Sequence, residues 1–264
     1  MSEQAKKCLF LGRLNEKWYE KVCFGLSITG IAQTKVIAHR GYWKTKGSAQ
    51  NSIKALKNAA EIGVYGSEFD VWVTKDSVAV VNHDKDINGI VIEEATYEQI
   101  KREKLPNGEE ISTLEEYLRQ GAKYRKMKLV LELKDHHKEE NDKKAVDVVI
   151  EEVKKSKAYR SGQIEFISFN FEMCKKFARE FPDITVSYLT GEKSPKVLFK
   201  EGIDGIDYNK AVLSIAKGWI KEAHELGMVV NVWTVNDATT IKKFGDWGVD
   251  FITTDEPELA LEIL

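Results

Sequence analysis

Three strand-like runs in the first third of the chain, VIAHRG, GSEFDVWVT and VAVVNHD, carry ionisable residues. Glu68 and Asp70 are two positions apart. Because strand side chains alternate between faces, both carboxylates should project to the same side and can share one hard cation. His39 and His83 belong to the first and third runs, and histidine is the side chain best suited to proton transfer near neutral pH. These residue types predict metal-assisted acid/base chemistry.

A later run, LVLELK, adds Glu132 and Lys134, which should again share one face. A carboxylate in such an apolar run needs a charged partner, and a cation shared with Glu68 and Asp70 would meet that need. Three carboxylates without a cysteine favour a hard divalent ion over zinc, and Mg²⁺, Ca²⁺ and Mn²⁺ all fit. The alternative is that Glu132 and Lys134 form a buried ion pair without metal.

Several motifs occur in a fixed order along the chain: H-R-G at residue 39, E-F-D at 68, H-D at 83, E-L-K at 132, S-F at 168, W-T-V-N at 233 and the closing GVDFITTDEP. Together they resemble the glycerophosphodiester phosphodiesterase family, within the superfamily of phosphatidylinositol phospholipase C-like barrels. The resemblance runs from about residue 35 to the end. It implies metal-dependent hydrolysis of small glycerophosphodiesters to glycerol 3-phosphate and an alcohol.

The resemblance also implies roles for individual residues. His39 and His83 match the family's general acid and base, and the sequence does not say which is which. Trp233 matches a tryptophan that lines the substrate pocket, although a core aromatic would look the same in the sequence. A phosphodiester must have its negative charge neutralised before it is attacked. We expect Arg40, whose planar fork suits phosphate, to do this together with Lys134 and the metal.

One position departs from the family pattern. Where the family usually reads P-E-N-T or P-E-N-S, this chain has Ala49-Gln50-Asn51-Ser52. Asn51 or Ser52 can still cap the following helix. Gln50 keeps the shape and the hydrogen-bonding reach of glutamate without its charge, so we expect it to alter cation affinity or substrate preference rather than to abolish catalysis.

The remainder of the chain alternates between strand-like and helical patterns, which predicts a single (β/α)₈ TIM barrel over residues 34–264. The predicted strands are Val36–His39, Ser67–Val73, Lys128–Leu133, Ile164–Phe169, Ile184–Leu189, Gly205–Tyr208, Val229–Val235 and Phe251–Thr254. The predicted helices are Ser52–Ile62, Leu114–Gln120, Lys143–Ser156, Phe171–Phe181, Pro195–Lys200, Ala211–Leu226, Ala238–Trp247 and Pro257–Leu264.

Two segments do not follow this alternation of strands and helices. Residues 84–113 are long for a connection and contain the turn signals Asn88-Gly89 and Pro106-Asn107-Gly108, which predicts a small inserted lobe over the barrel mouth. A mobile surface loop is the alternative. Asp135-His136-His137 precedes the charged run KEEND, and we interpret it as a solvated loop rather than a second metal site.

Composition limits the partners and the compartment. The chain has 40 basic and 42 acidic residues among 264, so its charge offers no global attraction for nucleic acid or an anionic membrane. Residues 1–33 contain the apolar run VCFGLSITGIA, too short to span a bilayer, and are predicted to be a signal peptide or else an N-terminal extension. A cleaved signal would make the protein periplasmic or secreted, and an uncleaved one cytoplasmic. The sequence does not indicate the oligomeric state.

Two other functions fit parts of the pattern. A metal-independent phospholipase C of the phosphoinositide type also uses paired histidines on a barrel, but it would not need three carboxylates. A non-catalytic module that binds glycerophospho-groups would use an inherited pocket, and Gln50 keeps this alternative open.

Overall fold

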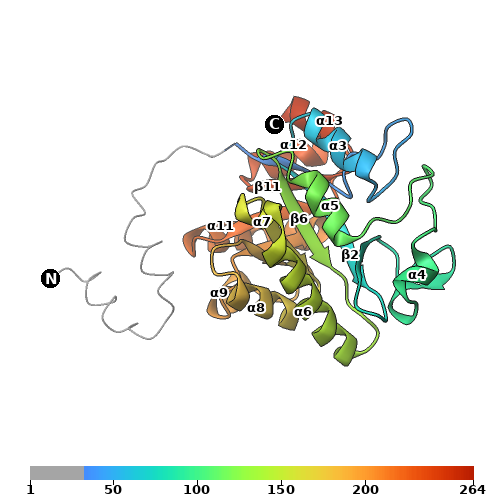
Figure 1. The fold of residues 1–264 in the computed structure, drawn as a ribbon. Coiled ribbons are helices and arrows are strands. Elements are labelled where there is room, and N and C mark those ends of the chain that lie inside the picture. The colour runs from blue at the N-terminus through green and yellow to red at the C-terminus, as the bar shows by residue number, and fades with distance from the viewer. Residues whose placement is uncertain (1–32) are drawn as a thin grey trace. The chain divides into compact units, whose positions relative to one another are not determined.

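The computed structural model describes residues 33–264, so the apolar run of the predicted signal lies outside the described residues. Within this range eight parallel strands form a barrel, which β1 closes by pairing with both β11 and β2 (Figure 1). The strands are β1 (Lys35–Ala38), β2 (Gly66–Val73), β6 (Lys128–Leu133), β7 (Ile164–Ser168), β8 (Val186–Tyr188), β9 (Gly205–Asn209), β10 (Val229–Trp233) and β11 (Phe251–Thr254). The predicted (β/α)₈ barrel is confirmed.

Helices connect the strands and pack their apolar faces on the outside of the barrel. They are α3 (Ile53–Glu61), α5 (Leu114–Gly121), α6 (Glu139–Lys155), α7 (Lys157–Arg160), α8 (Phe171–Glu180), α9 (Pro195–Lys200), α10 (Lys210–Ile215), α11 (Gly218–Glu225), α12 (Ala238–Asp246) and α13 (Pro257–Ile263). The single helix predicted over Ala211–Leu226 is wrong. Ala216 leaves the helical conformation and Gly218, a poor helix former, starts a separate helix.

Side-chain alternation on β2 explains how charged residues enter the barrel. The strand is buried on both faces, as in other parallel sheets. Phe69 and Val71 point outward into the core between strands and helices, where the Phe69 ring stacks on Tyr117 with 4.4 Å between centroids. Glu68 and Asp70 therefore face the barrel interior.

Residues 84–113 form a folded lobe beside the barrel. The hairpin of β4 (Asp86–Ile87) and β5 (Ile90–Val91) turns through Asn88 and Gly89, both with positive φ, followed by η1 (Ile92–Glu94) and α4 (Tyr97–Ile100). Their apolar side chains pack on Trp72 of β2 and Val80 of β3 (Ala79–Val81), the strand antiparallel to β2. This packing argues against a mobile loop.

The predicted solvated loop at residues 135–137 is wrong for His136. Its ring is buried, packs edge-on against Trp72 at 5.1 Å between centroids, and accepts a hydrogen bond at Nε2 from the Val73 backbone N–H. His137 binds the buried carboxylate of Glu93 in the lobe. Burial between the lobe and β2 is a tertiary contact that the local run of charge does not reveal.

No helix within residues 33–264 is long and apolar enough to cross a membrane.

Candidate active site

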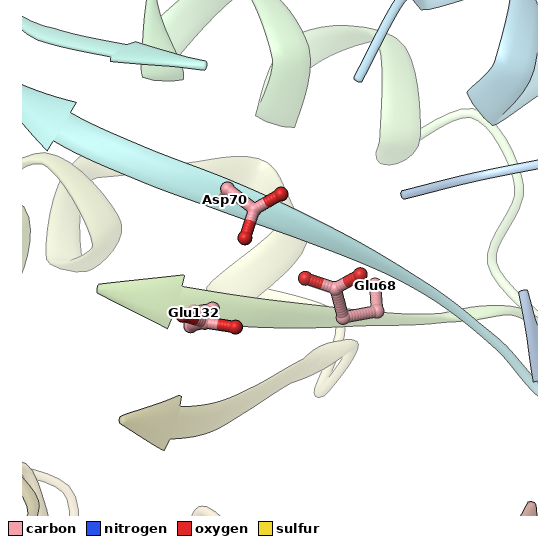
Figure 2. Close-up of side chains that lie close together, drawn as sticks. All are labelled: Glu68, Asp70 and Glu132. Atoms are coloured by element: carbon pink, nitrogen blue, oxygen red, sulfur yellow. The ribbon is translucent and has the colours of Figure 1, made fainter. Parts of the chain in front are cut away.

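Glu68 and Asp70 from β2 and Glu132 from β6 lie close together inside the barrel (Figure 2). The two strands are neighbours, and Asp70 is paired in register with Glu132. One carboxylate oxygen from each residue lies within 4.8 Å of the other two, and all three side chains are buried. Such a set of hard oxygen donors could hold one divalent cation.

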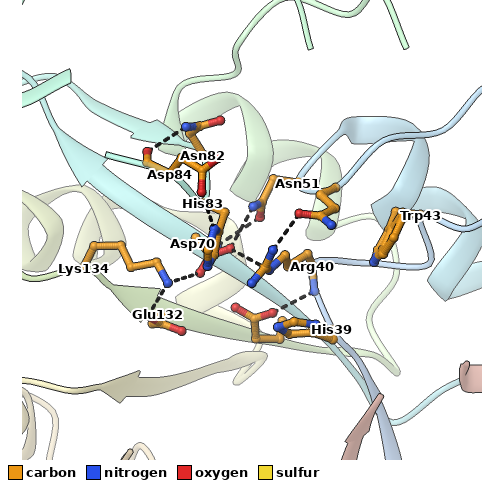
Figure 3. A network of polar contacts seen from close by, with 12 residues as sticks. His39, Arg40, Trp43, Asn51, Asp70, Asn82, His83, Asp84, Glu132 and Lys134 are labelled. Carbon is orange, nitrogen blue, oxygen red and sulfur yellow. Dashed lines mark hydrogen bonds and ion pairs between the residues drawn. The ribbon is translucent and has the colours of Figure 1, made fainter. Parts of the chain in front are cut away.

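Two basic side chains contact this cluster. Lys134 Nζ lies 2.6 Å from Asp70 Oδ1 and 2.5 Å from Glu132 Oε1, and Arg40 Nε lies 3.7 Å from Asp70 Oδ2 (Figure 3). The ion pair that we considered for Glu132 and Lys134 is therefore present. It leaves Glu68 Oε1 buried without a hydrogen-bond partner among the described residues. A bound cation would satisfy this oxygen, so the residues present fit a metal.

The pKa values of the three carboxyl groups are consistent with a site that would bind a cation. Burial, followed by repulsion from Asp70 and Glu132, raises the pKa of Glu68 well above its usual range. Burial and Asp70 also raise the pKa of Glu132 to about 7. Burial acts to raise the pKa of Asp70, but the charge of Lys134, together with smaller effects of other nearby charges and a hydrogen bond, outweighs burial and lowers that pKa. When all three acids are ionised they outnumber the two bases, and a bound cation would stabilise that ionised state.

The H-R-G turn holds Arg40 beside these acids. Arg40 has a positive φ, and its backbone N–H donates to Glu68 Oε2 at 2.7 Å. Gly41 also has a positive φ, and a Cβ there would lie 2.8 Å from the Ala55 backbone, so only glycine fits the turn. The motif thus contains one residue whose side chain serves the site, Arg40, and one that the turn requires to be glycine, Gly41.

In the A-Q-N-S segment that follows, Ser52 caps helix α3, whereas Gln50 and Asn51 contact residues of the site. Of the two residues predicted as possible caps, Ser52 caps α3 by accepting a hydrogen bond from the Ala55 N–H. Asn51 instead binds the acidic cluster, since its amide donates to Asp70 Oδ2 at 2.8 Å and accepts from the Asp70 N–H. Gln50 accepts from Arg40 Nη1 at 2.6 Å, so it contacts the guanidinium without adding a negative charge.

Both predicted histidines line a cavity of about 100 Å³ together with Arg40, Glu68 and Glu132. His39 Nδ1 lies 2.8 Å from Asp255 Oδ1, and His83 Nδ1 lies 2.7 Å from the exposed Asp84. Burial is the main cause that lowers the pKa of His83. The structure thus brings the two histidines together with Arg40, Lys134 and the carboxylates of Asp70 and Glu132 (Figure 3).

Apolar side chains also line this cavity. They are Ile167, Phe169, Leu189 and Trp233, with Phe169 edge-on to Trp233 at 5.6 Å between centroids. The Trp233 indole donates to the Asp207 backbone oxygen at 2.9 Å, which fixes the ring. Trp233 therefore lines the cavity, and the alternative of a purely structural core residue does not describe its position.

The lobe acts on the cavity indirectly. Among the described residues that line the cavity, none belongs to residues 84–113. The lobe packs on Trp72, whose indole donates to the His83 backbone oxygen at 3.1 Å. The lobe therefore supports His83, and its position over the barrel mouth stays a prediction. A larger cavity of about 390 Å³, lined by Glu93 and His137 among others, lies apart from the acidic cluster.

Sequence reasoning missed two polar residues next to His39. The sequence analysis included Asp255 and Asn236 only as parts of the motifs GVDFITTDEP and W-T-V-N. In the structure Asp255 contacts His39, and Asn236 Nδ2 donates to Asp255 Oδ2 at 2.7 Å. Their position directly after β11 and shortly after β10, at the catalytic end of a barrel, was the available signal.

An acidic cluster, two basic side chains and two histidines at the C-terminal face of a TIM barrel define a barrel enzyme suited to phosphate esters. Comparison with known proteins specifies the family. The model of the Glycerophosphoryl diester phosphodiesterase family matches residues 39–259. The chain therefore belongs to this family.

Individual relatives agree with this assignment. A crystal structure of a glycerophosphodiester phosphodiesterase from Parabacteroides distasonis is 48% identical, with a TM-score of 0.86 over 89% of this chain and 98% of that one. One from Thermotoga maritima is 27% identical, with a TM-score of 0.70 over 88% and 98% of the two chains. A glycerophosphodiester phosphodiesterase of Bacillus altitudinis is 29% identical over 87% of this chain and 98% of the relative.

Proposed function

We propose that this protein hydrolyses small glycerophosphodiesters to glycerol 3-phosphate and an alcohol with the help of one divalent cation. The observation that carries the proposal is the convergence of Glu68, Asp70 and Glu132 beside Arg40 and Lys134 in one cavity. Family membership supports the substrate class.

The basic and the acidic side chains have different roles in the proposed reaction. Arg40 and Lys134 bind the non-bridging oxygens of the phosphate, because both are positively charged groups at the edge of the cavity. A cation held by the three carboxylates would add positive charge against the same phosphate, and their hard oxygens favour Mg²⁺ or Ca²⁺, with Mn²⁺ also compatible.

His39 and His83 transfer the protons. One accepts a proton from the attacking oxygen, and the other donates a proton to the oxygen of the departing alcohol. Both rings reach the cavity, which supports this division. The apolar side chains of Phe169 and Trp233 line the same cavity and would contact the carbon skeleton of the substrate.

A panel of glycerophosphodiesters carrying choline, ethanolamine, inositol or glycerol tests the proposal. Release of glycerol 3-phosphate is followed with EDTA and with each divalent ion added in turn. We expect release that requires a divalent ion. Equal turnover in EDTA would favour the metal-independent phospholipase C type, and tight binding without turnover under any ion would favour a binding module.

We also propose that residues 1–33 act as an export signal, on the strength of their apolar run. Mass spectrometry of the mature protein in its host checks this proposal. An intact N-terminus on cytoplasmic protein would contradict it.

A further inference from the structure

We infer that Asp207 determines part of the substrate specificity. Its carboxyl group lies at the floor of the active-site cavity and binds the terminal hydroxyl group of the glycerol part of the substrate. The inference rests on the proposed function. It adds a contact at the end of the glycerol that lies farthest from the phosphate.

The strand pattern directs Asp207 into the barrel. Its neighbours Ile206 and Tyr208 belong to the core outside the barrel strands, so the side chain between them faces the interior. There Asp207 lines the same cavity of about 100 Å³ as the two histidines. It approaches that cavity from β9, a strand that carries none of the residues assigned to the reaction above.

Asp207 stands across the barrel from Glu68 and Asp70. Going round the closed sheet from β2 to β9, one passes β6, β7 and β8 in one direction and β1, β11 and β10 in the other. The two strands are therefore opposite each other. A substrate whose phosphate lies beside the acidic cluster would extend toward Asp207 with its other end.

The cavity is closed below Asp207. A second cavity of only about 10 Å³ lies next to it and is lined by Asp207 and by Val130, which precedes Glu132 by two residues on β6. This small cavity is thus one layer nearer the N-terminal ends of the strands, and its volume suffices for one water molecule at most. In the same layer a Cβ at Gly205 would lie 2.6 Å from a Val229 methyl group. No part of a substrate can pass beyond Asp207.

The carboxyl group has an unmet hydrogen bond. Asp207 is 2% exposed, and its Oδ1 has no hydrogen-bond partner among the described residues. Burial raises the pKa of Asp207 to about 7, against a hydrogen bond from Asn231 that lowers it. A hydroxyl group can both donate and accept, so it suits this carboxyl group in either protonation state. A cationic group would suit only the ionised form.

The closed floor indicates which hydroxyl group binds there. The alcohols that glycerophosphodiesters carry differ in size, so that part of the substrate needs the open mouth of the cavity. A floor of fixed size fits the part that all these substrates share, which is glycerol. With the phosphate at Arg40 and Lys134, the terminal hydroxyl is the group that reaches farthest from them.

The test compares glycerophosphocholine with an analogue that has a methyl group in place of the terminal CH₂OH and keeps the 2-hydroxyl. The wild type should hydrolyse the analogue with a kcat/KM lower by roughly 10–10²-fold, because the buried oxygen then stays without a partner. Asp207→Ala should lose a similar factor on glycerophosphocholine and change by less than about threefold on the analogue. The preference for the hydroxyl group would thereby disappear.

Two further variants control for structural effects. Asp207→Asn keeps an oxygen that can accept from the hydroxyl group, so it should retain part of the preference. Glu165→Gln changes a buried acid on β7 that lines the small cavity, and it should keep the full preference. The Trp233 indole binds the backbone oxygen of Asp207, a contact that both side-chain replacements leave in place.

The wild-type comparison needs no variant and can refute the inference alone, through equal kcat/KM values for the two substrates. A folded Asp207→Ala protein that keeps the wild-type preference, with both substrates slowed alike, would overturn it as well.

A binding measurement separates this inference from the proposed function. Calorimetry of the wild type should give a Kd for 2-hydroxypropyl phosphate, which lacks the terminal hydroxyl, roughly tenfold weaker than for glycerol 3-phosphate. In Asp207→Ala the two Kd values should be equal. If no glycerophosphodiester is hydrolysed, the proposed function fails while this comparison still decides the role of Asp207. Equal affinities in the wild type would contradict that role.

Discussion

The change Glu68→Gln tests the acidic cluster through stability as well as activity. Glutamine has the shape of glutamate, and its Oε1 can still accept the Arg40 N–H that now binds Glu68 Oε2. The substitution therefore removes charge without creating a cavity. Because burial and two neighbouring acids raise the pKa of Glu68, its ionised form destabilises the protein without metal. In EDTA at pH 8 the variant should be at least as stable as the wild type, and more stable by up to roughly 4 kcal/mol.

Added cation should stabilise the wild type far more than the variant. A ligand at about 100 times its Kd stabilises a folded protein by roughly 2.7 kcal/mol. For a domain of this size about 1 kcal/mol corresponds to roughly 2–4 °C in Tm, so the wild type should gain about 5–11 °C. Glu68→Gln loses one of three charged ligands and should gain only a small fraction of that. Its turnover should be abolished or nearly so.

The assay is thermal unfolding in EDTA, then with Mg²⁺, Ca²⁺ or Mn²⁺, against NaCl of the same ionic strength. The matched control is Glu165→Gln, a buried glutamate on β7 that binds the Tyr65 hydroxyl and lies outside the acidic trio. It should keep the full shift. Equal metal-dependent shifts in the wild type and Glu68→Gln, or full activity of Glu68→Gln, would refute the assignment of Glu68 as a ligand.

Three further predictions concern other residues. Replacing His39 or His83 with alanine should lower kcat by roughly 10²–10⁴-fold, and rates with an acidic leaving alcohol should recover for only one of the two variants, that of the proton donor; equal recovery of both would contradict the division of roles. Trp233→Ala should raise KM by about tenfold, since it removes one wall of the cavity, and an unchanged KM in a substrate titration would argue against that contact. Burial raises the pKa of Glu152 from 4.5 to about 7, so its protonated form stabilises the fold below pH 4.5 and that contribution is lost as pH rises through 7. Glu152→Gln should therefore add roughly 1–2 kcal/mol in urea unfolding at pH 8, after a discount for partial exposure, and nothing near pH 4; an equal gain at both would be inconsistent with the shift.

Much of the fold follows from local patterns in the sequence. Strand side chains alternate with a period of two, so the placement of Glu68 with Asp70 needs no knowledge of distant residues. The Asn88-Gly89 turn is local in the same sense, because two consecutive residues with positive φ suit few other sequences. Alternating strand and helix patterns then favour one barrel topology.

Interactions between distant segments could not be predicted this way. A strand pattern says which residues share a face and does not say which strand lies next to it, so the pairing of Asp70 with Glu132 required the barrel register. Burial of His136 against Trp72 depends on how the lobe packs, and its charged sequence neighbours gave the opposite impression. The break after Ile215 falls within one continuous helical pattern, so periodicity alone does not reveal it.

The sequence by itself determined the residue types of the site and the faces on which they stand. Local backbone geometry fixes those, within a few residues of each motif. Only the tertiary structure decided that Asp255 and Asn236 would support His39, because closing the barrel brings β11 beside β1. That contact spans almost the whole domain, and no periodicity in a single chain encodes which two strand ends will meet.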